Sequence, residues 1–123
     1  MAIAIVINDE GIVTLIVEGT VLRILEKDGT AEDHRNPALD VTEGRRGATL
    51  RKAIELGARV FVAPPATFCE LSYEKAQQEQ VTFINIAANQ TFTQVAEQIQ
   101  SGVTSVSAEL PADEVVSSAP VTV

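Results

Sequence analysis

The spacing of apolar residues changes partway along the chain, and this change restricts the fold more than any other feature of the sequence. Short apolar runs typical of β-strands come first, and helical and strand-like segments alternate from Gly47 onward. The run at 2–8 is continuously apolar, as expected of a strand buried on both faces. Short turns separate it from further runs at 12–17 and 20–27, and such turns favour antiparallel pairing. We therefore expect a three-stranded meander at the start of the chain.

The second part of the chain predicts parallel strands. A polar segment, 30–43, is expected to form a loop. After it we expect a helix over 47–56, a strand over 59–63, a helix over 68–78, a strand over 81–86 and a helix over 92–101. Strands separated by helices run parallel through right-handed crossovers. The order βββαβαβα therefore predicts an α/β fold, a three-layer domain with a mixed five-stranded sheet, and ribonuclease-H-like domains share this order.

Two of the expected helices begin at a capping-box pattern. In this pattern a hydroxyl and an acid or amide three residues later bond each other's backbone N–H groups. Thr67 with Glu70 forms the first box, and Thr91 with Gln94 forms the second. The first box predicts that the Thr67 hydroxyl caps a helix whose second residue is Cys69.

The length and the composition of the last segment predict the domain organisation. A chain of 123 residues fits one domain, which we place at 1–102. Residues 103–123 contain no Lys or Arg and are rich in Val, Ser, Ala and Pro. This composition predicts a C-terminal tail or an edge segment docked on a neighbour.

Charge and cysteine content exclude several classes of protein. The chain holds 17 acidic and 9 basic residues, a net charge of -8, so neither nucleic acid nor an anionic membrane is an expected partner. One Cys and one His cannot form an internal disulfide or a closed zinc site within one chain. The apolar start lacks the basic flank of a signal peptide, and no apolar run approaches the ~20 residues that span a bilayer. A cytoplasmic protein is expected.

Basic residues concentrate in one region of this acidic chain. Five of the nine lie between Arg45 and Arg59. The four that surround the expected helix start are Arg45, Arg46, Arg51 and Lys52. Unpaired amides at a helix start, together with guanidinium groups, suit a polyanion, although the spacing is not that of a P-loop. The alternative is a solvated segment whose cations pair with nearby acids, and the sequence leaves both open.

Two side chains are candidates to ligate a metal. Cys69 follows the expected fourth strand, where open α/β sheets bind ligands, and a helix N-terminus favours its thiolate. Such a thiolate is a typical ligand of iron–sulfur clusters. His34, in the expected loop, is the second candidate ligand, and Thr67 is assigned to the same cofactor site. The alternatives are a buried structural Cys69 and a plain surface His34.

A series of segments, in order over about residues 1–101, matches the pattern of a known family. The segments are Met1–Ile5 with Asp9 and Gly11, Leu22–Gly29, Asn36–Ala38, Gly47 and Leu56–Val62. Together they resemble the dinitrogenase iron–molybdenum cofactor biosynthesis family. The run 55–62 is also similar to small accessory proteins of the iron-only nitrogenase. Family members often have Gly after the fourth strand, where this chain has Pro64, Pro65 and Ala66.

The resemblance implies a non-enzymatic binding or carrier protein for an anionic iron–sulfur or iron–molybdenum cofactor or its precursor. The function implied is nitrogen fixation, with nitrogenase or cofactor-assembly proteins as partners. The four cations would supply charge, and Cys69 or His34 the metal ligand. An enzyme is not expected, because no catalytic constellation is recognisable and residues 2–7 hold no acid for nuclease chemistry. The alternative is a protein–protein interaction module with the same fold and no metal ligand. In it, the run 103–106 pairs with the sheet edge of a second chain to form a homo-oligomer.

Overall fold

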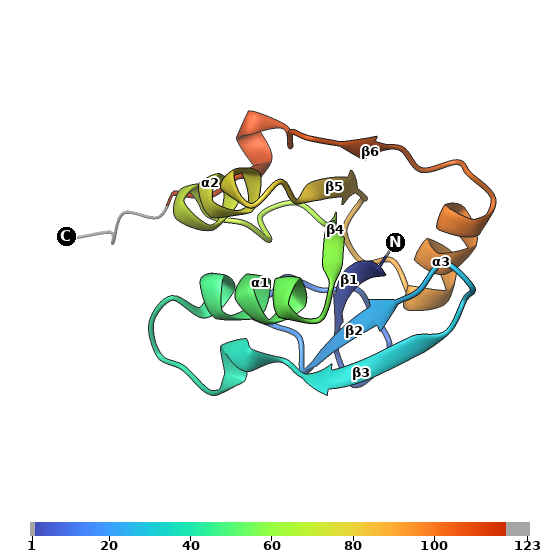
Figure 1. Cartoon of the computed structure of the whole chain (residues 1–123), viewed down its shortest axis with the longest axis horizontal. Helices are drawn as coiled ribbons and strands as arrows, with labels where there is room; N and C mark the ends of the chain where they lie inside the picture. Colours follow the sequence, from blue (N-terminus) through green and yellow to red (C-terminus); the bar gives the residue numbers. More distant parts are fainter. Residues whose placement is uncertain (1, 118–123) are drawn as a thin grey trace.

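The computed structural model describes residues 2–117, in which one mixed sheet is covered by helices on both faces (Figure 1). The strands of this region are β1 (Ala2–Ile7), β2 (Val21–Leu25), β3 (Ala31–Arg35), β4 (Ala58–Ala63), β5 (Thr82–Asn85) and β6 (Val106–Ser107). Its α-helices are α1 (Arg45–Glu55), α2 (Glu70–Gln78) and α3 (Phe92–Gln100). The short 3-10 helices are η1 (Pro37–Leu39) and η2 (Ala112–Glu114). The predicted α/β class is confirmed.

The strand order fixes where the helices begin. The order is β3-β2-β1-β4-β5-β6, with β1, β4 and β5 parallel and the other strands antiparallel to their neighbours. Because α1 leads into β4 and α2 leads from β4 into β5, both helices begin at the carboxyl end of the parallel strands. The described residues form six strands instead of the predicted five, because β3 and β6 were not predicted and the predicted strand at 12–17 is absent.

The predicted division into a domain at 1–102 and a tail at 103–123 stays a prediction. Within the second range, β6 pairs in this chain, with Val106 opposite Ile84. Residues 118–123 lie outside the described residues.

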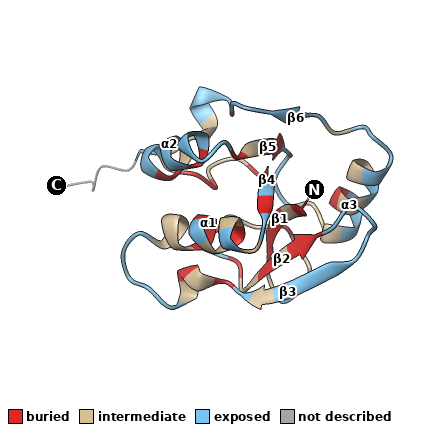
Figure 2. Ribbon diagram, in the orientation of Figure 1, coloured by how far each residue is buried: buried red, intermediate tan, exposed pale blue. Residues whose placement is uncertain are grey.

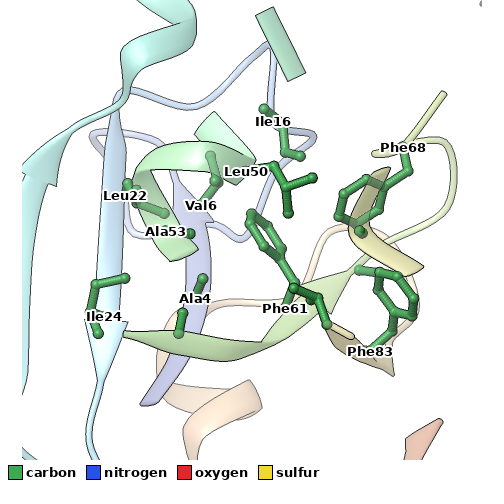
Figure 3. Packing of buried hydrophobic residues seen from close by; sticks show 14 of the residues in the cluster. Ala4, Val6, Ile16, Leu22, Ile24, Leu50, Ala53, Phe61, Phe68 and Phe83 are labelled. Atoms are coloured by element: carbon green, nitrogen blue, oxygen red, sulfur yellow. The ribbon is translucent and has the colours of Figure 1, made fainter. Parts of the chain in front are cut away.

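Alternate residues of the central strands point into two separate cores. In β4, Phe61 packs on the face covered by α1 and α2, whereas Val60 and Val62 pack on the face covered by α3. On the first face the rings of Phe61, Phe68 and Phe83 meet edge to face, with 5.3 Å between the centroids of each successive pair (Figure 3). Figure 2 shows the buried central strands between exposed helix surfaces. Burial on both faces explains why this strand is apolar from Val60 to Ala63, after the exposed Arg59.

Two predictions for the first part of the chain are wrong. The run 12–17 is not a strand: its apolar residues Val13 and Ile16 are buried, but they lie in the loop between β1 and β2. The polar segment 31–35, predicted as part of a loop, is strand β3 at the edge of the sheet. It pairs with β2, and the Arg23 Nε–Asp33 Oδ1 ion pair of 2.6 Å joins directly opposed residues. Both faces of β3 are largely exposed, so no apolar alternation marks it.

Of the two predicted capping boxes, the one before α2 differs from the structure and the one before α3 agrees with it. The predicted Thr67 capping box is wrong, because the Thr67 hydroxyl accepts a hydrogen bond of 2.9 Å from the Ile16 N–H instead. The residue that precedes α2 is Cys69, and its N–H donates to Ser72 Oγ at 2.9 Å. The second box is confirmed: Thr91 and Gln94 bond each other's backbone N–H groups. Within residues 2–117, no helix combines the length and the hydropathy that a bilayer span requires.

Candidate functional site

A cavity of about 340 Å³ opens between the N-termini of α1 and α2, and we call it the α1–α2 cavity. Both N-termini lie at the carboxyl end of the parallel strands, where open α/β sheets bind their ligands. The cavity is lined by Gly44, Arg45, Arg46, Gly47, Cys69, Leu71, Ser72, Lys75 and Ser117.

The described lining of the α1–α2 cavity contains three cations and no Asp or Glu. The cations are Arg45, Arg46 and Lys75. The first amides of two helices add partial positive charge at the same place. Lys75 Nζ lies 3.3 Å from Glu79 Oε1, one turn further along α2, in an exposed ion pair. The cavity is therefore a locally positive region on a chain whose net charge is -8.

The two arginines are held in place by backbone carbonyl groups. Arg45 Nε donates to Ala38 O at 2.8 Å, and its Nη2 donates to Val17 O at 3.0 Å. Arg46 Nε donates to Thr67 O at 3.1 Å. A guanidinium group has five N–H donors and keeps its charge, so these bonds orient the two side chains at the cavity wall.

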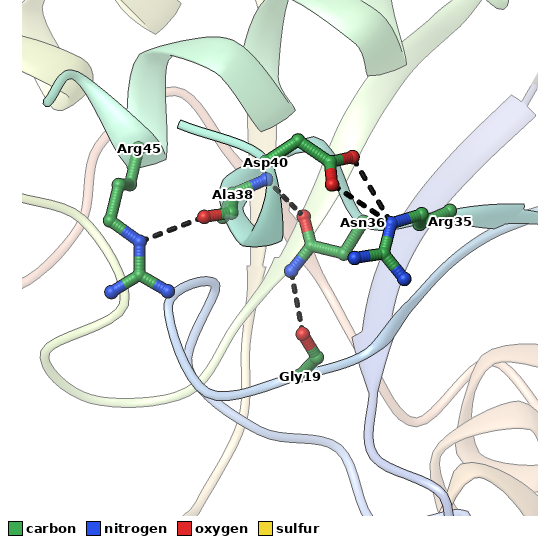
Figure 4. A network of polar contacts seen from close by, with 6 residues as sticks. All are labelled: Gly19, Arg35, Asn36, Ala38, Asp40 and Arg45. Atoms are coloured by element: carbon green, nitrogen blue, oxygen red, sulfur yellow. Dashed lines mark hydrogen bonds and ion pairs between the residues drawn. The ribbon is translucent and has the colours of Figure 1, made fainter. Parts of the chain in front are cut away.

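A buried polar network lies beneath the start of α1 (Figure 4). Asn36 and Thr49 are both 0% exposed. Asn36 Nδ2 donates to Ile16 O at 2.7 Å and to Gly19 O at 2.9 Å. Asn36 Oδ1 accepts from the Thr49 hydroxyl at 2.6 Å and from the Ala38 N–H at 3.2 Å. One amide side chain thus ties the β1–β2 loop, η1 and α1 together, and fixes the carbonyl groups that Arg45 contacts.

Thr67 does not line the α1–α2 cavity. It is buried, and it joins two loops: its hydroxyl accepts from the Ile16 N–H, and its carbonyl accepts from Arg46. Ala66, just before it, has a φ of 69°, in the left-handed region that favours glycine. Ala66 therefore holds a backbone conformation that glycine adopts more readily than alanine.

Cys69 lines the α1–α2 cavity and is half-buried. Its Sγ lies 3.2 Å from Ser72 Oγ, on the first turn of α2. The thiol therefore stands beside the same helix N-terminus as the cations, although as the residue before the helix rather than its second residue.

Arg51 lines a second cavity of about 300 Å³, further along the groove between α1 and α2. The lining residues are Gly47, Leu50, Arg51, Ile54, Glu55, Lys75 and Glu79. The two cavities share Gly47 and Lys75, so they adjoin. Two acids stand in this second lining, which makes it less positive than the first.

Two predicted site residues lie elsewhere. Lys52 is not among the residues that line either cavity. His34 belongs to β3 rather than to a loop, and its Nε2 lies 2.8 Å from Glu32 Oε1. The strands β2 and β1 separate β3 from β4, after which Cys69 follows. Within residues 2–117, no group of three or more His, Cys, Asp or Glu side chains is placed to hold a metal ion.

The structure thus brings together three predicted residues and adds one that the prediction missed. Arg45, Arg46 and Cys69 share the α1–α2 cavity, and Lys75 joins them from α2. A signal for Lys75 exists in the sequence, since it is the only base after residue 60. Its place opposite α1 depends on how two helices pack, which the sequence does not state.

Comparisons with known proteins support the fold alone. No protein-family model matches the chain, and no curated protein matches it. Among solved structures, the chain is similar to the apo form of the orange protein from Desulfovibrio gigas, with a TM-score of 0.73 and 14% sequence identity. The match covers 87% of this chain and 92% of the other. At this identity the likeness describes a shared architecture, and the site is argued from its own residues.

Proposed function

We propose that this protein is a non-enzymatic binding or carrier protein that holds an anionic guest in the α1–α2 cavity. The observation that supports this is the convergence of three cations and two helix N-termini on a cavity whose described lining has no acid. The backbone carbonyls that hold Arg45 and Arg46 reduce the ordering cost of binding, because these side chains are already fixed. An anion therefore gains charge-assisted hydrogen bonds with little loss of side-chain freedom.

Within this proposal, the guest is an iron–sulfur or iron–molybdenum-type cofactor or its precursor. Cys69 lines the same cavity and offers a thiolate, which is the usual ligand of iron–sulfur clusters. One thiolate is no complete ligand set, so the cations and amides must provide most of the attraction. His34 would need a separate site on β3. Arg51 and Lys52 would add positive potential from α1 without touching the guest.

The fold and the fold neighbour are in keeping with this function. The strand order β3-β2-β1-β4-β5, with β2 antiparallel to its neighbours, supports a fold of the ribonuclease-H-like kind. The orange protein is described in its apo form, a term for a protein without its bound group. We extend the proposal to nitrogen fixation, with nitrogenase or cofactor-assembly proteins as the partners that deliver or receive the guest.

The direct test is transfer of a cluster. The protein is incubated anaerobically with a synthetic, thiolate-ligated four-iron four-sulfur cluster, and the protein fraction from gel filtration is examined for visible absorbance. We expect the absorbance to elute with the protein. Cys69→Ser keeps a small polar side chain before α2, where serine is a good N-cap, and it removes only the thiolate. We expect this variant to keep less cluster than the wild type, and a colourless wild-type fraction would contradict the proposed guest.

A second candidate is a protein–protein interaction module without a metal ligand. Val103 and Val106, in the run that the sequence assigns to an edge contact, are 73% and 52% exposed, which favours a contact surface for an apolar partner. The two functions separate in one experiment, because Val103 does not line the α1–α2 cavity, so Val103→Asp would weaken a partner contact and leave retention of the cluster unchanged. A homo-oligomer of this kind would shift the gel-filtration mass of the wild type, and Val103→Asp would reverse the shift.

A further inference from the structure

We propose that the anionic guest carries an apolar organic part, which extends from the α1–α2 cavity into the second cavity between the same two helices. The inference rests on the proposed function, because the charged end of the guest lies in the α1–α2 cavity. It adds a role for the second cavity, of about 300 Å³, and it names the chemical class of the guest: a single anionic group joined to an apolar body.

The two cavities adjoin and are together the size of a small-molecule site. Gly47 and Lys75 line both of them, and the helices α1 and α2 that border them lie side by side (Figure 1). Their volumes are about 340 and 300 Å³. Sites for organic ligands in proteins range from about 300 to 1,000 Å³, so a compound larger than an isolated ion fits across the pair.

The second cavity has apolar side chains in its lining. Leu50 is buried in the core that α1 and α2 share, and Ile54 packs against that core while it stays half-buried. Arg51 and Lys75 border the same cavity and are exposed. The side chains of arginine and lysine have methylene stems that cover apolar surface while their charged ends stay in water. This lining suits a hydrocarbon chain better than it suits a second charged group.

The charges of the two linings decide which way such a guest lies. The α1–α2 cavity has three cations and no acid in its described lining, whereas in the second cavity two acids balance two cations. The acids are Glu55 and Glu79, and Glu79 Oε1 lies 3.3 Å from Lys75 Nζ. An anionic group is therefore attracted to the first cavity, and a second anionic group at the other end would meet Glu55 and Glu79. The guest has one charged end and an uncharged body.

Gly47 leaves space at the point where the two cavities meet. It lies in the first turn of α1, and glycine is one of the residues least favourable in a helix. A Cβ at this position would meet no heavy atom of another described segment within 4 Å. Packing within the described residues therefore does not require glycine here. The missing side chain leaves room for a guest that passes from one cavity into the other.

The test measures the affinity of the full-length protein for phosphate esters of increasing chain length, with calorimetry as the readout. The probes are inorganic phosphate, ethyl phosphate and hexyl phosphate. We expect hexyl phosphate to bind at least about tenfold more tightly than ethyl phosphate, because each fully buried methylene group contributes about fourfold. A hexyl chain with a phosphate at each end should bind less tightly than hexyl phosphate, and tighter binding would contradict the orientation that we propose. This series needs no variant that folds poorly.

Variants place the chain in the second cavity. Ile54→Ala removes part of the apolar lining and should lower the ratio of hexyl to ethyl affinity about threefold or more, with the ethyl affinity unchanged. Leu56→Ala is the matched control, because Leu56 is also half-buried against the same core and lines neither cavity. Gly47→Leu puts a side chain where the cavities meet and should lower the same ratio. The ratio cancels any effect of a variant on the charged end.

Four outcomes separate this inference from the proposed function. A gain for hexyl phosphate that Ile54→Ala and Gly47→Leu reduce, and Leu56→Ala does not, supports both. Equal affinity of the wild type for all three probes overturns the apolar part and leaves the anion site standing. A gain that all three variants keep in full means that the chain binds elsewhere, and it overturns the role of the second cavity. Absence of binding by every probe overturns both proposals.

Discussion

Replacing Asn36 should destabilise the protein more than any other single change at a polar residue near the site. Its side chain is fully buried and makes four hydrogen bonds, to Ile16 O, Gly19 O, the Ala38 N–H and the Thr49 hydroxyl. At about 1 kcal/mol net for each bond, Asn36→Ala should lower the free energy of unfolding by about 4 kcal/mol. That is a large share of the roughly 5–15 kcal/mol that stabilises an ordinary domain.

Two further substitutions make this prediction specific. Asn36→Asp keeps the shape but places an acceptor opposite the carbonyls of Ile16 and Gly19, so at pH 7 it should cost at least as much as alanine. Thr49→Val removes one hydroxyl and should cost about 1–2 kcal/mol, whereas Thr49→Ser keeps the hydroxyl and should cost less. In the double variant Asn36→Ala with Thr49→Val, the two losses should not add, because they share one bond.

The assay is urea unfolding followed by far-ultraviolet circular dichroism. The loss should appear as a lower midpoint at an unchanged slope, because the change is one of stability and not of the surface exposed on unfolding. A loss below about 1 kcal/mol for Asn36→Ala would refute the four-bond network, since one typical bond contributes that much.

Three further predictions concern other parts of the fold. A Cβ at Gly19 would collide with the side chain of Val6 and lie 2.9 Å from Ile7 O, so Gly19→Ala should cost about 2 kcal/mol in urea unfolding, and a neutral result would contradict this packing. Thr91→Ala should cost about 1 kcal/mol by the same assay, because it removes the hydroxyl that caps α3, and Thr91→Ser should restore most of that loss. The hydrogen bond that Arg23 donates lowers the pKa of Asp33, so the stability it contributes is present above about pH 4 and lost as pH falls through the folded pKa. Asp33 is half-exposed, so Asp33→Asn should cost less than about 1 kcal/mol at pH 7, and thermal melts should converge with those of the wild type at pH 2; a constant difference at both pH values would contradict the pairing.

The sequence predicted the elements whose burial leaves a regular pattern of apolar residues, either a continuous run or a helical stripe. Within the predicted strands at 2–8 and 59–63, residues 2–7 and 60–63 are apolar on both faces because helices cover both faces of the sheet. The stripe on α3 is equally plain, since one side of that helix packs on the sheet through Val95 and Ile99. In these segments the same apolar contacts that decide the fold also leave a regular pattern.

The sequence did not reveal structure that depends on contacts between distant segments. Strand β3 is polar on both faces and forms because its backbone pairs with β2. Its own residues therefore show no apolar strand pattern. The run 12–17 is apolar because the loop is buried, and burial alone does not distinguish a strand from a packed loop. The Thr67 hydroxyl does not cap α2, because it accepts a hydrogen bond from the N–H of Ile16, which lies 51 residues earlier in the chain.

The candidate site was predictable only where its residues lie near the expected helix starts. Arg45, Arg46 and Cys69 were found because each lies near an expected helix start, and helix starts meet at one edge of a parallel sheet. Lys75 lies inside α2 and reaches the cavity only because α2 packs beside α1. Asn36 and Thr49 could not be singled out from the sequence, because only the tertiary fold shows that these two polar side chains are buried.

The most direct test of the anion site reverses one charge. Lys75→Glu places an acid in the lining of the α1–α2 cavity, whereas Lys52→Glu makes the same change on α1 outside both cavities. Reversal next to a bound anion should weaken phosphate binding at least about tenfold, since each unit-charge contact contributes about 1 kcal/mol or more at 4 Å. We expect calorimetry to find this loss for Lys75→Glu and a much smaller one for Lys52→Glu. Equal losses in both variants would mean that phosphate senses only the net charge of the chain, and the proposed cavity would not be its site.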